Sequence, residues 1–390
     1  MKNSVSLLRP LLLICSLSMT SLAQAQESIE PEENKPNYLQ IPVPFNGKFY
    51  GDFRFRTEKI QEQQLAPLKD SDLLRQRMRL RIGGSAEVNS QTEVGVRLST
   101  DSALGNEPNT TNQDLSGYYS KKSIVLDLAY FNWKATENIR ILGGKTPLPF
   151  EFVADNDLIF DNDVTPEGLS VKYNQTVDLA HDLMAVASAT WLNERYSADG
   201  SAENTDVGLL ALQLGYAFKG ADFGIRAVGS YLNFANIKGD KAPAAKGNTV
   251  DGGGNYVHNY ELSSLGLELF SEVAGQPISF FAEYVKNSRD DDYNTAQIYG
   301  IQFGELKDVS SWAVTLDYRQ VEKDAVVGLL TDSDSAGGGT DIRSWKTSLA
   351  YQVGRNANVA LTYFNGKEAI SSPVFSPDYQ RTMLDFNFSF

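Results

Sequence analysis

From Gly47 onward, hydrophobic and polar residues alternate one by one within segments of about ten residues. In one such segment, Phe53 and Phe55 alternate with Arg54 and Arg56. Because successive side chains of a strand point to opposite faces, this pattern predicts β-strands with one apolar and one polar face. Alternation alone does not distinguish a water-soluble sandwich from a membrane barrel, whose apolar face points outward to lipid.

The number and spacing of these segments favour the membrane barrel. The chain holds sixteen candidate strands: 47–58, 74–87, 92–100, 123–134, 138–145, 167–175, 183–192, 206–218, 221–234, 260–272, 277–287, 295–304, 309–319, 344–353, 357–365 and 379–390. Connections after even-numbered strands are short, whereas four after odd-numbered strands are long and polar: 101–122, 146–166, 235–259 and 320–343. This regularity predicts an all-β transmembrane antiparallel β-barrel with short periplasmic turns and long extracellular loops. We expect 16 strands, and 14 or 18 are the alternatives because three segments are ambiguous.

The N-terminal residues predict export from the cytoplasm. Lys2 and Arg9 precede the apolar stretch 11–19, and Ala23-Gln24-Ala25 has the form of a signal-peptidase site, so residues 1–25 are predicted to be a signal peptide. Residues 26–46, rich in Pro, Glu and Asn, are predicted to be an acidic periplasmic leader. The barrel pore would then span 47–390, in the bacterial outer membrane.

Composition excludes several other classes of protein. Cleavage would remove Cys15, the single cysteine, which argues against a disulfide scaffold, a thiol nucleophile and a Cys-ligated zinc site. No apolar span outside the N-terminus reaches the length of a membrane helix. The chain has 49 acidic and 35 basic residues, so we expect no nucleic-acid partner.

The last strand adds an independent indication. Thr382, Leu384, Phe386 and Phe388 alternate with polar residues, and the sequence ends at Phe390. A terminal Phe on such a strand resembles the assembly signal of outer-membrane barrels. The expected partners are therefore the barrel-assembly machinery, outer-membrane lipid and lipopolysaccharide.

Several stretches also resemble a known family. They are RQRMRLRIGGSAEVNSQTEVGVRLST (75–100), NTTNQDLSGYYSKKSIVLDLAYFNWK (109–134), ILGGKTPLPFEF (141–152) and LIFDNDVTPEGLSVKY (158–173). They resemble the bacterial "putative porin" outer-membrane family, specifically over about 47–175 and only in architecture beyond. The resemblance implies an outer-membrane pore for small polar solutes, and the likeness to general porins implies a homotrimer.

Charge placement gives the candidate chemistry. The polar faces of the first three strands carry eight basic and four acidic residues, an excess of four positive charges. The acids are Asp52, Glu58, Glu87 and Glu93, and Lys48 is one of the bases. The other seven bases form what we call the arginine ladder: Arg54, Arg56, Arg75, Arg77, Arg79, Arg81 and Arg97. An arginine facing lipid near the midplane costs several kcal/mol, so we expect the ladder to line the pore. Alternatively, neighbouring carboxylates neutralise the ladder and only stiffen the wall.

The connection 146–166 is a second charged element. It carries no basic residue and five acids: Glu151, Asp155, Asp157, Asp161 and Asp163. Its apolar residues, such as Phe150 and Phe160, are unusual for a solvated loop. In the general porins that the sequence resembles, the loop at this ordinal position folds into the barrel. We therefore expect an acidic constriction loop facing the ladder, with an external solvated loop as the alternative.

The remaining polar residues predict no further site. His181 and His258 have no second histidine at ligand spacing, so we expect no metal site, no cofactor and no enzyme. The acids at 290–292, with Asp332 and Asp334, are expected in external loops, as solvated charges or as lipopolysaccharide bridges through divalent cations. The main hypothesis is a porin for passive diffusion of ions and small hydrophilic solutes. The alternatives are an anion-selective channel for phosphate or carboxylates, and a structural or adhesive barrel.

Overall fold

The computed structural model describes residues 47–101, 107–195 and 206–390. The predicted signal peptide and acidic leader lie outside the described residues. The strands are β1 (Gly47–Glu62), β2 (Ser71–Asn89), β3 (Thr92–Thr100), β4 (Gln113–Asp114), β5 (Ile124–Lys134), β6 (Ile139–Lys145), β7 (Glu167–Thr176), β8 (His181–Asn193), β9 (Val207–Lys219), β10 (Phe223–Ala235), β11 (Tyr260–Val273), β12 (Gln276–Asn287), β13 (Thr295–Gly304), β14 (Trp312–Val321), β15 (Ile342–Gly354), β16 (Ala357–Lys367) and β17 (Asp378–Ser389).

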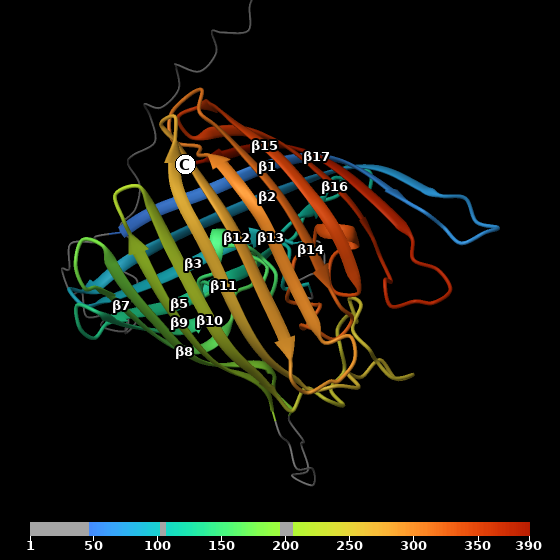
Figure 1. The fold of residues 1–390 in the computed structure, drawn as a ribbon, viewed down its shortest axis with the longest axis horizontal. Coiled ribbons are helices and arrows are strands. Elements are labelled where there is room, and N and C mark those ends of the chain that lie inside the picture. Colours follow the sequence, from blue (N-terminus) through green and yellow to red (C-terminus); the bar gives the residue numbers. More distant parts are fainter. Residues whose placement is uncertain (1–46, 102–106, 196–205) are drawn as a thin grey trace, which may run out of the picture. The chain divides into compact units, whose positions relative to one another are not determined.

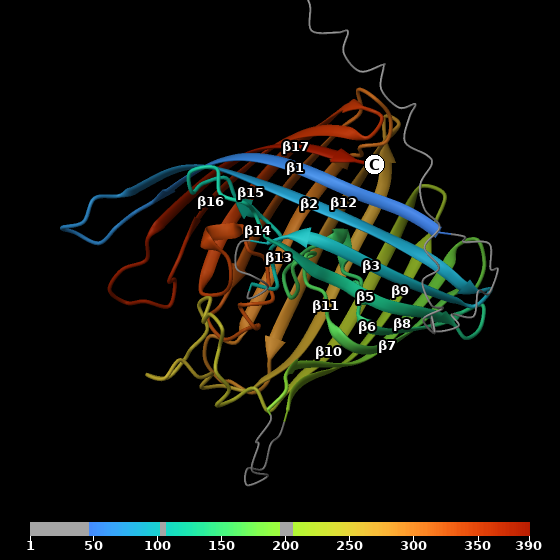
Figure 2. The same cartoon turned by 180° about the vertical axis from the view of Figure 1, so that it is seen from behind.

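The strands form one closed antiparallel barrel (Figures 1 and 2). Strand β3 pairs with β5, every other barrel strand pairs with the next along the chain, and β17 pairs with β1 to close the ring. The two-residue β4 stands outside this series and pairs with β2 at Arg77 and Met78, beyond the end of β3. Sixteen strands therefore close the barrel, and the predicted count and fold class are confirmed.

The two faces of the sheet differ as the alternation predicts. On β9, Leu210, Leu212 and Leu214 are exposed, whereas Leu209 and Gln213 are buried on the inner face. The outer face is therefore the apolar one, which is the arrangement of a barrel surrounded by lipid. The described residues include two short 3-10 turns, η1 (Val153–Asp155) and η2 (Ser335–Gly337), and no helix that is long and apolar enough to cross a membrane.

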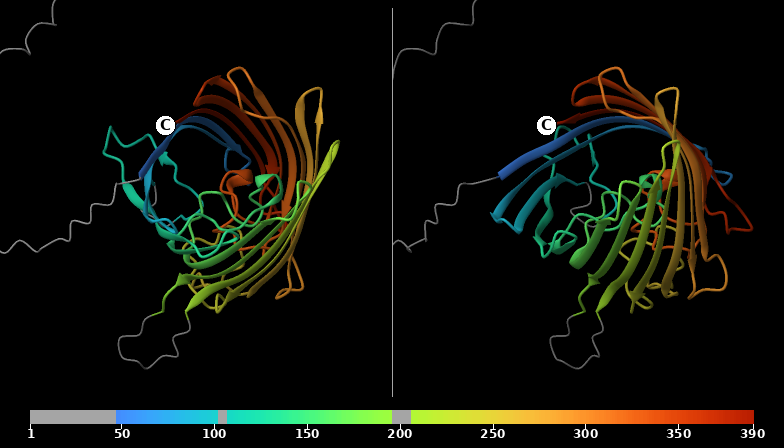
Figure 3. Two further views of the ribbon diagram at one scale, coloured as in Figure 1. Left: turned by 90° about the vertical axis from the view of Figure 1, so that its left-hand side faces the viewer. Right: turned by 60° about the vertical axis from the view of Figure 1, so that its left-hand side comes forward.

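Long connections occupy the inside of the ring (Figure 3). The β6–β7 loop (146–166) contains η1, and the β14–β15 loop (322–341) contains η2. Both contribute buried side chains to one hydrophobic cluster that also includes inner-wall residues of β8 to β15. We call this inner space the lumen, and the ends of the barrel its long-loop end and its short-turn end.

Candidate functional site in the barrel lumen

The arginine ladder lies mainly on two adjacent strands. In the β1–β2 register, Arg54 stands opposite Arg79, and Arg56 stands opposite Arg77. Like charges directly opposite each other on neighbouring strands repel. The ladder is therefore stable only where carboxylates lie between its members, and the neighbouring elements supply them.

Towards the short-turn end, two carboxylates hold Arg79 and Arg81. Asp52 on β1 lies 2.9 Å from Arg79 and 2.6 Å from Arg81. Asp163, from the β6–β7 loop, lies 3.2 Å from Arg81 and 3.7 Å from Arg79. Burial disfavours the ionised form of Asp163, yet the nearby Arg79 and Arg81 hold the pKa of this carboxyl below its usual value. One of the five loop acids thus meets the ladder in direct ion pairs.

Further along the wall, the pattern of paired charges repeats. Glu58 is fully enclosed between Arg75 and Arg381. Asp114 on β4 lies 2.7 Å from Arg77 and 3.8 Å from Arg75. The short strand β4 therefore supplies the carboxylate that separates these two arginines.

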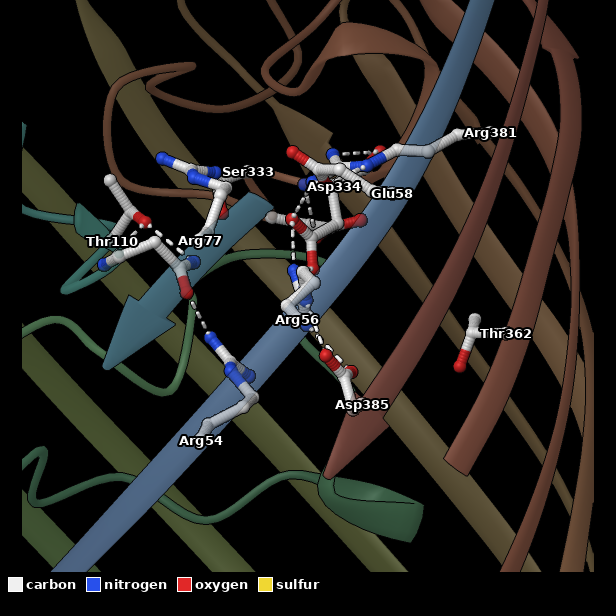
Figure 4. A network of polar contacts seen from close by, with 12 residues as sticks. Arg54, Arg56, Glu58, Arg77, Thr110, Ser333, Asp334, Thr362, Arg381 and Asp385 are labelled. Carbon is white, nitrogen blue, oxygen red and sulfur yellow. Dashed lines mark hydrogen bonds and ion pairs between the residues drawn. The ribbon is translucent and has the colours of Figure 1, made fainter. Parts of the chain in front are cut away.

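The centre of the network joins β1, β17 and the β14–β15 loop (Figure 4). Arg56 is 2.7 Å from Asp385, its register partner on β17, and 3.2 Å from Asp334 of the loop. Asp334 is also 3.1 Å from Arg381. Burial disfavours the Asp334 carboxylate, but Arg381 and Arg56 keep its pKa below the usual value. Removing one member of such a buried network leaves its partners as unpaired charges.

Arg97 and Arg54 are the two remaining members of the ladder. Arg97 on β3 lies 2.5 Å from Asp127 on β5. Arg54 is the one ladder arginine that forms no ion pair with a carboxylate in the described part of the chain. It donates to Asn112 Oδ1 at 2.5 Å, while its Nε is buried without an acceptor. The ladder and Arg381 therefore make eight arginines, accompanied by seven carboxylates: Asp52, Glu58, Asp114, Asp127, Asp163, Asp334 and Asp385.

The other four acids of the β6–β7 loop lie away from the ladder. Glu151 is 3.5 Å from Lys172, and Asp157 is 2.7 Å from the buried Arg319 on β14. Asp161 accepts the backbone N–H of Ser333, and burial together with Asp163 and Asp157 raises its pKa well above the usual value. Asp155 forms no ion pair with any described residue.

Apolar side chains hold the β6–β7 loop against the wall formed by β8 to β13. Phe150 and Phe160 stack with ring centroids 5.5 Å apart, and Val153 is fully buried. Gly266 on β11 leaves room for Val153, because an added Cβ would lie 3.0 Å from its side chain. The polar backbone is also satisfied: Gln213 Oε1 accepts from the N–H of Glu151 at 2.8 Å.

The β14–β15 loop also enters the lumen. The prediction that Asp332 and Asp334 are solvated in an external loop is wrong, because both lie against lumen arginines. Asp332 is 2.7 Å from Arg319, which also binds Asp157. Arg319 thus joins this loop to the β6–β7 loop. The two loops are far apart in the sequence, so this contact could not be predicted from it.

Backbone and hydroxyl contacts join these two loops directly. Asp161 N donates to Leu330 O at 2.8 Å, and the hydroxyl of Thr331 donates to Leu158 O at 2.8 Å. Asn109, from the β3–β5 connection, donates to Thr331 O at 2.8 Å. Three connections therefore form one cross-linked assembly inside the barrel.

A polar cavity of about 540 Å³ remains on the lumen side near the short-turn end. Residues of β7 to β10 line it, together with Asn138 and with Glu151 of the β6–β7 loop. Its charged side chains are paired, Asp182 with Lys219 at 2.5 Å and Arg226 with Glu268 at 3.5 Å. The cavity therefore offers water a polar surface with little net charge.

The carboxylates and the arginine that reach the ladder from distant segments were not predicted from the sequence. Asp385 and Arg381 lie on the last strand, and closure of the ring places that strand beside β1. Closure of the predicted barrel, which pairs the last strand with the first, was therefore the one property of the sequence that could have predicted these two partners. For Asp114, Asp332 and Asp334 the sequence carried no such signal, because loop folding positions them.

Phe390 completes the seam between the first and last strands. It exchanges two backbone hydrogen bonds with Gly51, of 2.9 and 3.0 Å. Its ring lies over Gly51, where an added Cβ would be 2.5 Å away, and 6.3 Å from the ring of Phe49. The terminal side chain thus covers the β1–β17 junction.

Comparison with known proteins places the chain in a family. The "Putative porin" family model matches residues 53–259 and 253–390, so the chain belongs to that family of bacterial outer-membrane barrels. It is similar to OprB of Pseudomonas putida, in its high-pH structure, with 13% identity and a TM-score of 0.56 over 88% of this chain and 94% of that chain. It is also similar to Salmonella typhi OmpF, in a complex with daunomycin, with 14% identity and a TM-score of 0.51 over 88% and 97%. No curated protein matches the chain.

Proposed function

We propose that this porin allows passive diffusion of ions and small hydrophilic solutes, and that two inserted loops jointly set the size limit. The observation that carries the proposal is the contact of both loops, 146–166 and 322–341, with each other and with inner-wall side chains. A sixteen-stranded barrel is wide enough for a water channel. The loops and side chains inside it therefore determine which solutes pass.

Solutes would then meet a lumen wall whose positive and negative side chains nearly cancel in charge. Paired arginines and carboxylates form strong local dipoles, which orient polar solutes and disfavour apolar ones. The positive excess of the network is small and resides at Arg54, whose guanidinium meets an amide oxygen. This residue favours a second candidate, an anion-selective channel for phosphate or carboxylates.

The remaining expectations belong to the same proposal. Residues 1–25 would be the signal peptide, 26–46 a periplasmic leader, and 47–390 the pore. Phe390 would serve as the signal for the barrel-assembly machinery, and lipid and lipopolysaccharide would surround a homotrimer. We place the short turns in the periplasm and the long loops outside the cell.

Single-channel recording in a planar bilayer tests the proposal. The wild-type protein should give stable open steps, and the sign of the reversal potential under a KCl gradient tests the anion-selective alternative. Shortening loop 146–166 should enlarge the unit conductance, because it removes side chains from the lumen. Shortening the exposed β1–β2 tip, 63–70, is the matched control and should leave the conductance unchanged.

Two results would contradict the proposal. A folded barrel that gives no current would favour the structural or adhesive alternative. Equal conductance in the protein with a shortened 146–166 loop and in the wild type would show that this loop does not limit passage.

A further inference from the structure

Three long-loop-end segments bring His258, Asp290 and Asp324 together. They come from the β10–β11, β12–β13 and β14–β15 connections, and one ligand atom of each lies within 4.8 Å of the others. We propose that His258 and Asp324 bind a divalent cation of the Zn²⁺ class while Asp290 orients the imidazole, so that the ion ties the three loops together. This site is independent of the diffusion function proposed above.

The spacing suits an ion better than a direct contact. His258 Nδ1 is 2.9 Å from Asp290 Oδ2, which is a hydrogen-bond distance, but Nε2 is 4.0 Å from Asp324 Oδ2, which is too long for one. Zinc bonds of about 2.0–2.2 Å to nitrogen and oxygen, at a tetrahedral angle, place two ligands roughly 3.3–3.6 Å apart. An ion between Nε2 and Asp324 therefore needs only a small contraction.

The surroundings orient these groups as outer-shell partners orient metal ligands. Asp324 accepts the backbone N–H of Thr249 at 3.0 Å, the Thr249 hydroxyl at 2.6 Å and the Tyr260 hydroxyl at 2.8 Å. Asp290, which is close to Nδ1, fixes the imidazole so that Nε2 points to Asp324. A carboxylate–histidine pair of this kind commonly supports a metal-bound histidine.

The negative charge of the two carboxylates also favours binding of a cation. The Asp324 side chain is 3% exposed, and within the described residues neither Asp324 nor Asp290 forms an ion pair with a lysine or arginine. A buried carboxylate without a counter-charge is costly, and His258 can compensate only one of the two. A divalent cation would neutralise both carboxylates.

The donor set indicates which cation. An imidazole nitrogen together with a carboxylate oxygen suits Zn²⁺, Co²⁺ or Ni²⁺, whereas Ca²⁺ and Mg²⁺ prefer oxygen ligands alone. The His258 side chain is 29% exposed, so ions can reach it and water can fill the remaining positions. The sequence alone predicts no metal site, because His258 has no second histidine at ligand spacing, but a distant loop supplies the carboxylate donor.

Equilibrium dialysis of the detergent-purified, EDTA-treated barrel against Zn²⁺ tests the site, with Co²⁺ absorption as a second readout. We expect one ion per chain in the wild type, no ion in His258→Gln or Asp324→Asn, and about 10- to 100-fold weaker binding in Asp290→Asn. His181→Gln is the matched control and should bind like the wild type, because His181 lies at the short-turn end and contacts Tyr216.

Heat-modifiable migration on gels verifies that each variant is folded. A folded wild type that binds no ion, or a folded His258→Gln variant that binds as well as the wild type, would overturn the proposal. His258 would then form only an ion pair with Asp290. An effect of Zn²⁺ on channel current would rest in addition on the proposed function, so dialysis separates the two.

Discussion

The two sides of the lumen hold the inserted loops by different physical means. On the β17–β1–β2 side, loop carboxylates such as Asp163 and Asp334 enter positions between fixed arginines. On the β8–β13 side, the β6–β7 loop is held mainly by packed side chains such as Phe150 and Val153. The energy of an ion pair depends on its geometry and on screening by salt. The energy of apolar packing depends instead on the area and volume of the buried side chains. We therefore expect, within the proposed diffusion function, that the charged side governs ion selectivity and the apolar side governs pore size.

Weakening the apolar side should have the largest effect. Phe160 is 2% exposed and packs on Phe150 and Phe152, so Phe160→Ala should cost about 3–5 kcal/mol of packing energy. The loop should loosen, and single-channel recordings should show larger and noisier steps with little change in reversal potential. A change in selectivity without a change in conductance would break the proposed division between the two sides.

Weakening the charged side should alter selectivity instead. Replacing Arg77 and Arg79 by Ala leaves Asp114 without its nearest arginine and weakens the pairing of Asp52 and Asp163. The reversal potential under a KCl gradient should shift towards cations, while the barrel stays folded. Lys307→Ala, at an exposed short turn, is the control. An unchanged potential in the double variant would show that the ladder does not control selectivity.

The smallest effect is expected at Glu368, which follows β16 and belongs to neither side. Burial and the nearby Glu62 raise the pKa of Glu368 to about 7. Its charged form is therefore disfavoured in the folded state, and the folded barrel should lose stability as pH rises from about 4.5, the usual pKa of the group, to about 7. Glu368→Gln should raise the unfolding temperature at pH 8 and leave it nearly unchanged at pH 4, where the carboxyl is protonated in both the folded and the unfolded state. Thermal unfolding in detergent measures this, and an equal effect of Glu368→Gln at both pH values would exclude it.

The barrel can be predicted from local sequence patterns alone. Alternation along each strand fixes which side chains face lipid, and a shift by one residue would turn every arginine of the ladder outward. The regular spacing of short and long connections gave sixteen strands, and each predicted strand has a counterpart in the structure. These are local properties, so they can be predicted from neighbouring residues.

The pairing of the charges, in contrast, follows from how the whole chain folds. Asp385 reaches Arg56 through ring closure, and Asp334 reaches it through the fold of a loop far along the chain. The excess of four positive charges expected for the first three strands is therefore almost cancelled by carboxylates from elsewhere. Likewise, His258 gained two carboxylate neighbours from two other loops. Electrostatic partners depend on distances in space, and no local pattern encodes the path of a loop inside a barrel.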